Sequence, residues 1–241
     1  MEILLEAKNL SKEYVKTTGF FSRTSSSIKA LDNLSINIKK GITLAVVGES
    51  GSGKSTLAKS LIRLVEIDKG SITFKKRNMR TISGGELKAI RKNIQMIFQD
   101  PYASLNPRMK IINIMEEPLK IHDIGNSETQ YSKILSMIKR VGLGEGDLLK
   151  YPHQFSGGQR QRIGIARALY NDPDVLVLDE ATSALDGATE EGLMSAVDAL
   201  QGLKTIIIVA HRLSTIENCE YVYTLAKGKI VSESSNFGEI A

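Results

Sequence analysis

Hydrophobic and polar residues along the chain follow patterns typical of short strands and amphipathic helices. They alternate over residues 3–14 and 35–38, as in strands that have one buried face. Apolar runs at 42–47, 175–178 and 205–209 predict further strands, and the last two runs are apolar enough to be buried inside a sheet. The pattern therefore indicates an α/β protein with a mainly parallel sheet and an antiparallel β-subdomain near the N-terminus.

Helical periodicity follows the first apolar run and fills the middle of the chain. Leu57, Leu61 and Leu64 repeat at helical spacing after the glycine-rich segment 48–56 that follows the run at 42–47. Three prolines punctuate short helical patterns between residues 102 and 154, where one amphipathic face consists of Ile134, Leu135, Ile138 and Val141. We therefore expect a helical subdomain at about residues 100–160, inserted in a single domain that covers residues 1–241.

The remaining segments complete this outline. Further helices are expected at 160–170 and 193–200, and a β-hairpin is expected around 226–228. Segment 17–27, rich in glycine, serine and threonine, and segment 82–86, which contains two glycines, are predicted to be loops. The pattern contains no long internal repeat and no heptads.

Composition and charge narrow the class of protein. Of the 241 residues, 41% are hydrophobic and 24% are charged, which is ordinary for a soluble globular chain. The net charge of +5 is modest and no basic stripe is interleaved with aromatic residues, so nucleic acid is not an expected partner. The single cysteine, Cys219, excludes an internal disulfide framework and suits a reducing compartment, where it would be a small buried side chain.

Targeting signals give a further expectation about location. No apolar run approaches the roughly eighteen residues of a membrane-spanning helix. The first residues, Met1–Glu6, lack the basic segment of a signal peptide. We therefore expect a cytoplasmic chain, and any role at a membrane would come through a partner.

The most specific motif is a glycine-rich loop between a predicted strand and a predicted helix. It fits G-x-x-x-x-G-K-[ST], the pattern of a phosphate-binding loop, in the strand–loop–helix order that the pattern requires. Its residues are Gly48, Glu49, Ser50, Gly51, Ser52, Gly53, Lys54, Ser55 and Thr56. Glycines allow several N–H groups to point at one phosphate, and the helix N-terminus adds partial positive charge. Lys54 could then reach the β- and γ-phosphates, and the Ser55 hydroxyl could ligate Mg²⁺.

A pair of carboxylates follows the buried run at 175–178. Asp179 and Glu180 stand at the C-terminal end of that strand, where open α/β sheets bind ligands. Carboxylates are costly there unless they hold a metal or take part in chemistry, although a solvated turn is the ordinary alternative. Beside a phosphate loop, Asp179 is expected to hold Mg²⁺ and Glu180 to orient or deprotonate an attacking water.

Four weaker candidates each have an ordinary structural alternative. Phe155, Ser156, Gly157, Gly158 and Gln159 form a second glycine-rich turn that opens a helix, which suits either an anion or a plain helix cap. Tyr14, at the end of the first strand, could stack on a purine. Gln99 and His211 each come just after a strand, where an amide or an imidazole can enter a site.

Together these motifs resemble the ATP-binding-cassette (ABC) family over essentially the whole chain. The resemblance implies a P-loop ATPase fold and a role for each candidate. Tyr14 would stack on adenine, Gly48–Thr56 would be the Walker A loop, and Phe155–Gln159 would be the signature sequence, with Phe where Leu is usual. Gln99 would contact Mg²⁺ and the catalytic water. The remaining matches are Asp179 (Walker B), Glu180 (catalytic base), Ser183, Ala184, Leu185 and Asp186 (dimer-interface loop) and His211 (switch histidine).

The family resemblance also implies partners and cofactors. In this family two chains pair head to tail, and ATP with Mg²⁺ lies between the Walker A loop of one chain and the signature of the other. A lone chain would therefore hold half a site. Transmembrane permease subunits would hold the ATPase peripherally at the inner face of the cell membrane and would convert its motion into transport. Segment 82–86 imitates part of the signature but precedes Gln99 and lacks the final glutamine.

The subfamily resemblance is divided along the chain. Segments 19–22, 98–107 and 151–154 resemble ATPases of oligopeptide, dipeptide and nickel importers, whereas 180–186 and 210–216 resemble lipid and multidrug exporter cassettes. One interpretation is a chimera, natural or engineered, that is joined near residues 179–186. A peptide-importer ATPase is the favoured function. The alternatives are an engineered or chimeric cassette ATPase without a physiological transport partner, or a soluble ABC ATPase outside transport.

Overall fold

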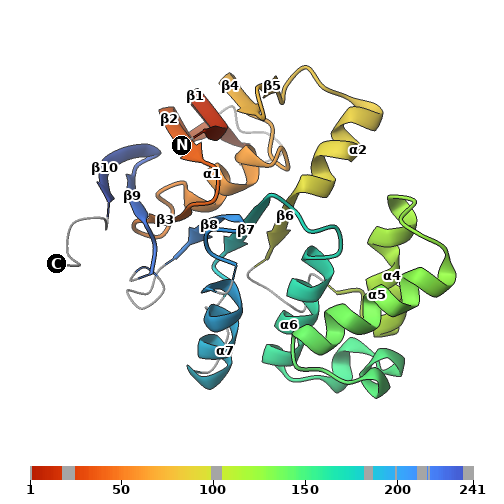
Figure 1. Cartoon of the computed structure of the whole chain (residues 1–241). Coiled ribbons are helices and arrows are strands. Elements are labelled where there is room, and N and C mark those ends of the chain that lie inside the picture. Colours follow the sequence, from red (N-terminus) through yellow and green to blue (C-terminus); the bar gives the residue numbers. More distant parts are fainter. Residues whose placement is uncertain are drawn as a thin grey trace. The chain divides into compact units, whose positions relative to one another are not determined.

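The computed structural model describes residues 2–17, 25–98, 105–181, 187–198, 200–210, 216 and 218–235. The chain divides into two compact units (Figure 1). The first consists of Met1–Leu87 and Thr205–Ala241, and the second of Lys88–Lys204. Each unit has its own strands and its own buried residues.

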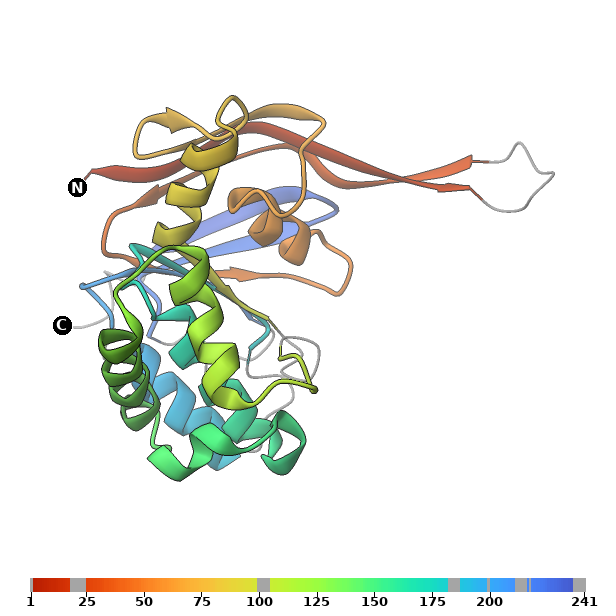
Figure 2. The ribbon, with the colours of Figure 1, turned by 90° about the vertical axis from the view of Figure 1, so that its right-hand side faces the viewer.

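The first unit contains an antiparallel sheet in the order β2–β1–β4–β5. Its strands are β1 (Ile3–Thr17), β2 (Ser25–Lys39), β4 (Lys69–Phe74) and β5 (Arg77–Asn78). β1 and β2 pair as far as Thr17 and Ser25, whereas the pairing of β1 with β4 ends where Ser11 meets Lys69. Figure 2 shows the result, a two-stranded ribbon that continues past the rest of the sheet.

The same unit contains four further strands in the order β10–β9–β3–β8. They are β3 (Thr43–Val47), β8 (Thr205–Val209), β9 (Tyr221–Ala226) and β10 (Lys229–Ser235). β3 is parallel to β8 and β9, whereas β9 and β10 form an antiparallel hairpin. The helix α1 (Lys54–Leu61) contacts both β8 and β2, and its Leu57 and Leu61 are fully buried. The helical spacing of these leucines therefore marks the core-facing side of α1.

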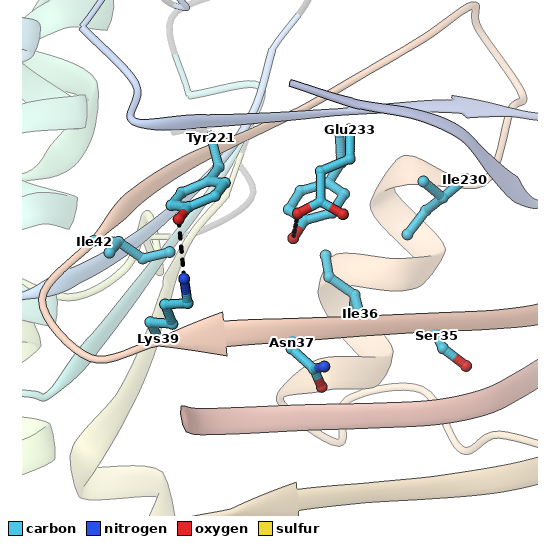
Figure 3. Close-up of a pocket in the computed structure, with 9 residues that line it drawn as sticks. Ser35, Ile36, Asn37, Lys39, Ile42, Tyr221, Ile230 and Glu233 are labelled. Carbon is cyan, nitrogen blue, oxygen red and sulfur yellow. Dashed lines mark hydrogen bonds between the residues drawn. The ribbon is translucent and has the colours of Figure 1, made fainter. Parts of the chain in front are cut away.

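A cleft of about 300 Å³ lies between β2 and the β9–β10 hairpin (Figure 3). Two polar contacts are made by residues along it. The Lys39 ammonium donates to the Tyr221 hydroxyl at 3.0 Å, and the Tyr223 hydroxyl donates to the Glu233 carboxylate at 2.9 Å. Burial, together with this carboxylate, raises the pKa of Tyr223. The first contact joins β2 to β9, the hairpin strand that borders β3, and the second joins β9 to β10.

The second unit contains two parallel strands and most of the helices. The strands are β6 (Ile94–Ile97) and β7 (Val175–Asp179), and the helix α2 (Gly84–Asn93) leads into β6. The other helical elements are α4 (Ile111–Ile121), α5 (Ser127–Arg140), η1 (Glu145–Leu149), η2 (Pro152–Gln154), α6 (Gly157–Ala168) and α7 (Gly187–Asp198). Apolar side chains of α4, α5 and α6 form one core that includes Ile111, Met115, Ile138 and Ile163.

Most predicted elements are present, and two predicted loops differ from the structure. Segment 25–27, predicted to be loop, is part of β2, because cross-strand pairing extends the hairpin beyond its apolar positions. Residues 84–86, also predicted to be loop, begin α2, because the helix continues through Glu86 despite two glycines. Cys219 is buried, as expected. Within the described residues, the helices are too short or too polar to cross a lipid bilayer.

The helical subdomain contains a stack of a half-buried histidine on a buried tyrosine. The ring centroids of His122 and Tyr170 are 5.6 Å apart, and the two rings are nearly parallel. The His122 Nδ1 and the Tyr170 hydroxyl are buried without a hydrogen-bond partner among the described residues. Burial lowers the pKa of His122, and the Lys92 and Lys88 ammonium groups lower it further. Burial also raises the pKa of Tyr170 to about 12. The neutral forms of both rings are therefore favoured in the folded chain.

We predict that the free energy of unfolding falls as the pH falls below the usual pKa of histidine, about 6.5. The unfolded chain then binds a proton that folded His122 resists, and this loss continues until the pH passes the lowered pKa of the folded state. Urea unfolding followed by circular dichroism between pH 8 and 5 measures the slope, which is at most about 1.4 kcal/mol per pH unit for one proton. His122→Gln should flatten that slope. An unchanged slope in the variant would contradict the prediction.

Candidate functional site

The predicted phosphate loop joins the end of β3 to the start of α1. Residues 48–53 form the turn, and Lys54, Ser55 and Thr56 form the first helical turn. Gly48 and Gly53 have φ of 142° and 108°, a region that side chains rarely adopt. A β-carbon on Gly48 would overlap the Leu225 carbonyl oxygen, and one on Gly53 would overlap the Ala30 carbonyl oxygen. The glycines therefore let the loop backbone lie directly against two neighbouring strands.

The polar groups of the loop suit an anion. The Lys54 ammonium, only 4% exposed, donates to the carbonyl oxygens of Gly48 at 2.8 Å and Glu49 at 2.9 Å. The Ser52 hydroxyl is buried, and it has no hydrogen-bond partner in the described part of the chain. A buried cation and a buried hydroxyl beside a helix N-terminus fit a bound phosphate, which would accept from all three.

A contact from the β9–β10 turn supports this loop, and the sequence analysis did not anticipate it. The Gly228 N–H donates to the Ser52 carbonyl oxygen at 2.9 Å, and the Gly228 carbonyl accepts from the Asp32 N–H at 3.0 Å. Gly228 therefore connects the phosphate loop with β2. The Lys227–Gly228 turn, with φ of 49° and 77°, was predicted only as a hairpin, since nothing in the pattern links it to Ser52 or Asp32 so much earlier in the chain.

The parallel register places the end of β8 near this loop. Val46 lies opposite Val209, and the Ala210 N–H donates to the Val46 carbonyl oxygen at 3.2 Å. Ala210 therefore lies beside Val46 of β3, and Val46 is two residues before Gly48. The candidate His211 comes next in the chain and lies outside the described residues.

Tyr14 lies on the two-stranded part of the β1–β2 ribbon. Its side chain is 43% exposed and stands opposite Ile28, which is 55% exposed. The Lys12 ammonium lies over its ring, 5.5 Å from the centroid. An exposed aromatic ring with a cation on one side is suited to stacking on a flat ligand.

The candidate carboxylates belong to the second unit. All five residues of β7 are buried, including Asp179 with 4% exposure. Glu180 follows with φ of 52°, a left-handed conformation that is uncommon for residues other than glycine and is found often at functional sites. Ile97 of β6 lies opposite Leu178 of β7, so the two parallel strands end side by side. Gln99, two residues beyond Ile97, lies outside the described residues.

The predicted signature begins α6. Phe155 is 5% exposed and belongs to the core of the helical elements. Ser156 is exposed and caps the helix, because its hydroxyl accepts from the Gln159 N–H at 3.3 Å while the Gln159 side chain accepts from the Ser156 N–H at 3.0 Å. The space around a β-carbon on Gly157 is open. The signature therefore has a buried anchor and an accessible helix start. The dimer-loop candidates, residues 183–186, lie outside the described residues.

Comparison with known families identifies the chain. Residues 31–183 match the ABC transporter family, over a segment that contains the phosphate loop, the signature and the carboxylate pair. The chain belongs to the ABC transporter family. It is therefore an ATPase that binds ATP together with Mg²⁺, as its resemblance to this family had indicated.

Relatives and solved structures agree with that assignment. The dipeptide transport ATP-binding protein DppF of Haemophilus influenzae is 44% identical, and the alignment covers 96% of this chain and 72% of DppF. The oligopeptide transport ATP-binding protein AppF of Bacillus subtilis is 41% identical over 90% of this chain and 67% of AppF. A dimeric structure of the ATP-binding cassette MJ0796 with ADP and Pi is 31% identical, with a TM-score of 0.84 and coverage of 96% and 98% of the two chains.

These similarities confirm the predicted fold class of the ABC ATPase. The antiparallel subdomain, the parallel strands and the helical elements were each expected from the sequence. The chain spans about two thirds to three quarters of the length of AppF and DppF. The alignment with DppF covers both the importer-like and the exporter-like segments, so the comparisons give no support for a junction between two parents.

We predict that Gly228→Ala weakens ATP binding as well as folding. The substitution places a β-carbon 3.0 Å from the Ala30 carbonyl oxygen and 3.1 Å from the Asp32 nitrogen, in a residue with φ of 77°. The strained conformation alone costs about 1 kcal/mol, and displacement of the turn also removes the contact with Ser52. Urea unfolding and ATP titration calorimetry measure the two effects.

Gly202→Ala is the matched control for this substitution. Gly202 has φ of 72°, and the space around an added β-carbon is open. Gly202→Ala should therefore lower the free energy of unfolding by about the same 1 kcal/mol while leaving ATP affinity unchanged. Equal ATP affinities in both variants would show that Gly228 does not support the phosphate loop.

Proposed function

We propose that the chain is the ATPase subunit of an importer for peptides, and that it works as a head-to-tail dimer beneath permease subunits at the inner face of the cell membrane. One observation carries this proposal: the 44% identity with a dipeptide transport ATP-binding protein extends over 96% of the chain. The oligopeptide transport protein OppF of Streptococcus mutans is also 41% identical over 95% of the chain. Both are named as ATP-binding proteins of peptide transport.

In the proposed site, the phosphate loop binds the nucleotide. The N–H groups of residues 48–56 and the Lys54 ammonium would donate to its phosphates, and the buried Ser52 hydroxyl would gain the partner that it lacks among the described residues. Lys54 would exchange the carbonyl oxygens of Gly48 and Glu49 for phosphate oxygens. Tyr14 would stack on the adenine, since its ring is exposed on the ribbon.

The metal and the catalytic water would be held by Ser55 at the start of α1 and by residues at or just beyond strand ends. Ser55, Asp179 and Gln99 are the proposed Mg²⁺ ligands, and bound Mg²⁺ would neutralise charge on the phosphate oxygens. Glu180 would accept the proton of the attacking water. His211 would hydrogen-bond the γ-phosphate, and the contact of Ala210 with β3 near Gly48 supports this placement.

The signature would act on the nucleotide of a second chain. Ser156 is exposed and Gly157 is unobstructed, so the start of α6 can approach a phosphate from outside. Residues 183–186 would lie at the same interface. The solved cassette MJ0796 is a dimer, which supports a site that is completed by two chains. Closure of such a dimer would exclude water and surround the γ-phosphate with preorganised donors.

The origin of the chain is a separate hypothesis. Residues 180–186 and 210–216 resemble exporter cassettes, whereas the full-length relatives named above take part in peptide transport. Comparison of residues 1–178 and 187–241 as separate sequences tests this hypothesis. If the two segments are most similar to different subfamilies, the result would support a chimera. If both are most similar to the same subfamily, the result would reject it.

The proposed two-chain site predicts that the Mg-ATPase rate per chain rises with protein concentration. Each monomer contributes half of each site, so turnover requires association.

Glu180→Gln should lower turnover at least about a hundredfold, the scale of general base catalysis, while ATP remains bound and traps a dimer that light scattering detects. The exposed Glu128 provides the control, and Glu128→Gln should keep the wild-type rate. A constant rate from a monomer would contradict the dimer, and hydrolysis by Glu180→Gln would contradict its role.

The transport role predicts selective assembly with peptide-importer permeases. Co-expression with the permease pair of an oligopeptide importer should recover the chain in detergent-solubilised membranes and should make its ATPase rate respond to peptide. The permease pair of a sugar importer is the matched control and should recover none. Recovery with neither pair, or equally with both, would contradict the proposed partner while leaving the ATPase assignment intact.

A further inference from the structure

The β1–β2 ribbon carries Tyr14 beyond the support of the rest of its sheet. The last pair between β1 and β4 joins Ser11 to Lys69, whereas Tyr14 pairs with Ile28 of β2. An isolated two-stranded ribbon is only marginally stable in water. The orientation of Tyr14 therefore depends on whatever holds the ribbon at the point where it leaves the sheet.

The pairing at that point is irregular. The register of β1 against β2 shifts between Leu10 and Lys12 and again between Lys12 and Glu13, and the register against β4 shifts between Lys8 and Ser11. Such bulges change the direction in which the following side chains point. Tyr14 comes directly after them, so their geometry determines where its ring lies.

One residue, Asp68, binds three consecutive residues of this irregular segment. Its carboxylate accepts from the Lys12 ammonium at 2.9 Å and from the Glu13 N–H at 2.7 Å. Its own N–H donates to the Ser11 carbonyl oxygen at 2.9 Å. The hydrogen bond from Lys12, with that from the Glu13 N–H, lowers the pKa of Asp68, so the carboxylate stays charged at neutral pH.

Asp68 also places a charge beside the tyrosine ring. The Lys12 ammonium that it binds lies 5.5 Å from the centre of the Tyr14 ring. The Lys12 side chain is 17% exposed, whereas Asp68 is 45% exposed. Asp68 therefore fixes two groups. One is the ammonium of Lys12, whose side chain is largely buried, over the Tyr14 ring, and the other is the backbone N–H of Glu13, the residue before Tyr14.

We propose that Asp68 is a positioning residue for the nucleotide base, because it holds the β1 bulge and Lys12 so that Tyr14 presents its ring to the adenine. This inference rests on the proposed role of Tyr14. The hydrogen bonds of Asp68 described above are all with β1 and none is with the phosphate loop. Asp68 therefore affects recognition of the base and leaves recognition of the phosphates unchanged.

Two probes separate these effects. AMPPNP contains the base and the phosphates, whereas inorganic tripolyphosphate contains only the phosphates. Asp68→Asn should raise the Kd for AMPPNP about tenfold, the scale of one base–aromatic stacking contact, and should leave the Kd for tripolyphosphate unchanged. In steady-state assays, KM for ATP should rise by a similar factor with kcat unchanged. Lys12→Met, which keeps the aliphatic stem, should raise the Kd for AMPPNP by a smaller factor.

Asp147→Asn is the matched control. Asp147 also accepts from a lysine, Lys150 at 2.7 Å, and from a backbone N–H, that of Gly144 at 2.8 Å, but it belongs to the helical elements of the second unit. Loss of the same two contacts there should change neither Kd. A loss of AMPPNP affinity in Asp147→Asn equal to that in Asp68→Asn would overturn the proposal.

A double-mutant cycle with Tyr14→Ala decides whether Asp68 acts through the ring. Asp68→Asn should have no further effect on AMPPNP binding once Tyr14 is absent. An undiminished effect in the Tyr14→Ala background, equal losses for both probes, or unchanged binding of AMPPNP would each overturn the proposal. Failure of the wild-type chain to bind either probe would instead contradict the proposed ATP site, and wild-type-like binding by Tyr14→Ala would contradict the role of Tyr14.

Discussion

Close packing of the backbone around the phosphate loop is the constraint on which the first unit depends. Gly48 and Gly53 lie against carbonyl oxygens from β9 and β2, at distances that exclude a β-carbon. The loop therefore has its shape only when β2, β3 and β9 come together, and the turn at Gly228 adds hydrogen bonds to the same assembly. The proposed binding of phosphate and the assembly of two sheets thus depend on the same few contacts.

Local pattern was sufficient to predict most of the fold. The apolar runs of β7 and β8 are buried as expected, because uninterrupted hydrophobic residues have few other stable environments in a soluble chain. The order of strand, glycine loop and helix is present as predicted, although α1 begins at Lys54, within the predicted loop, and ends at Leu61, before Leu64. These predictions succeeded because each depends on neighbours within a few residues.

Contacts between distant segments could not be predicted in this way. The link from Gly228 to Ser52 and the link from Asp68 to Lys12 join residues that no periodicity relates. The bulges before Tyr14 also leave no signature in an alternating pattern, because they depend on the pairing of β1 with two strands at once. The length of the ribbon was underestimated for the same reason, since cross-strand pairing extends it through polar residues.

The two adjacent residues Phe155 and Ser156 have opposite environments, and this has a mechanical consequence. Phe155 is packed in the helical core while Ser156 is exposed at the start of α6. A close-packed core transmits displacement with little compliance, so the signature cannot shift independently of α4 and α5. In the proposed dimer, a push delivered to these helices by a permease would reach the signature serine as a rigid-body displacement, and opening at the nucleotide would return along the same route.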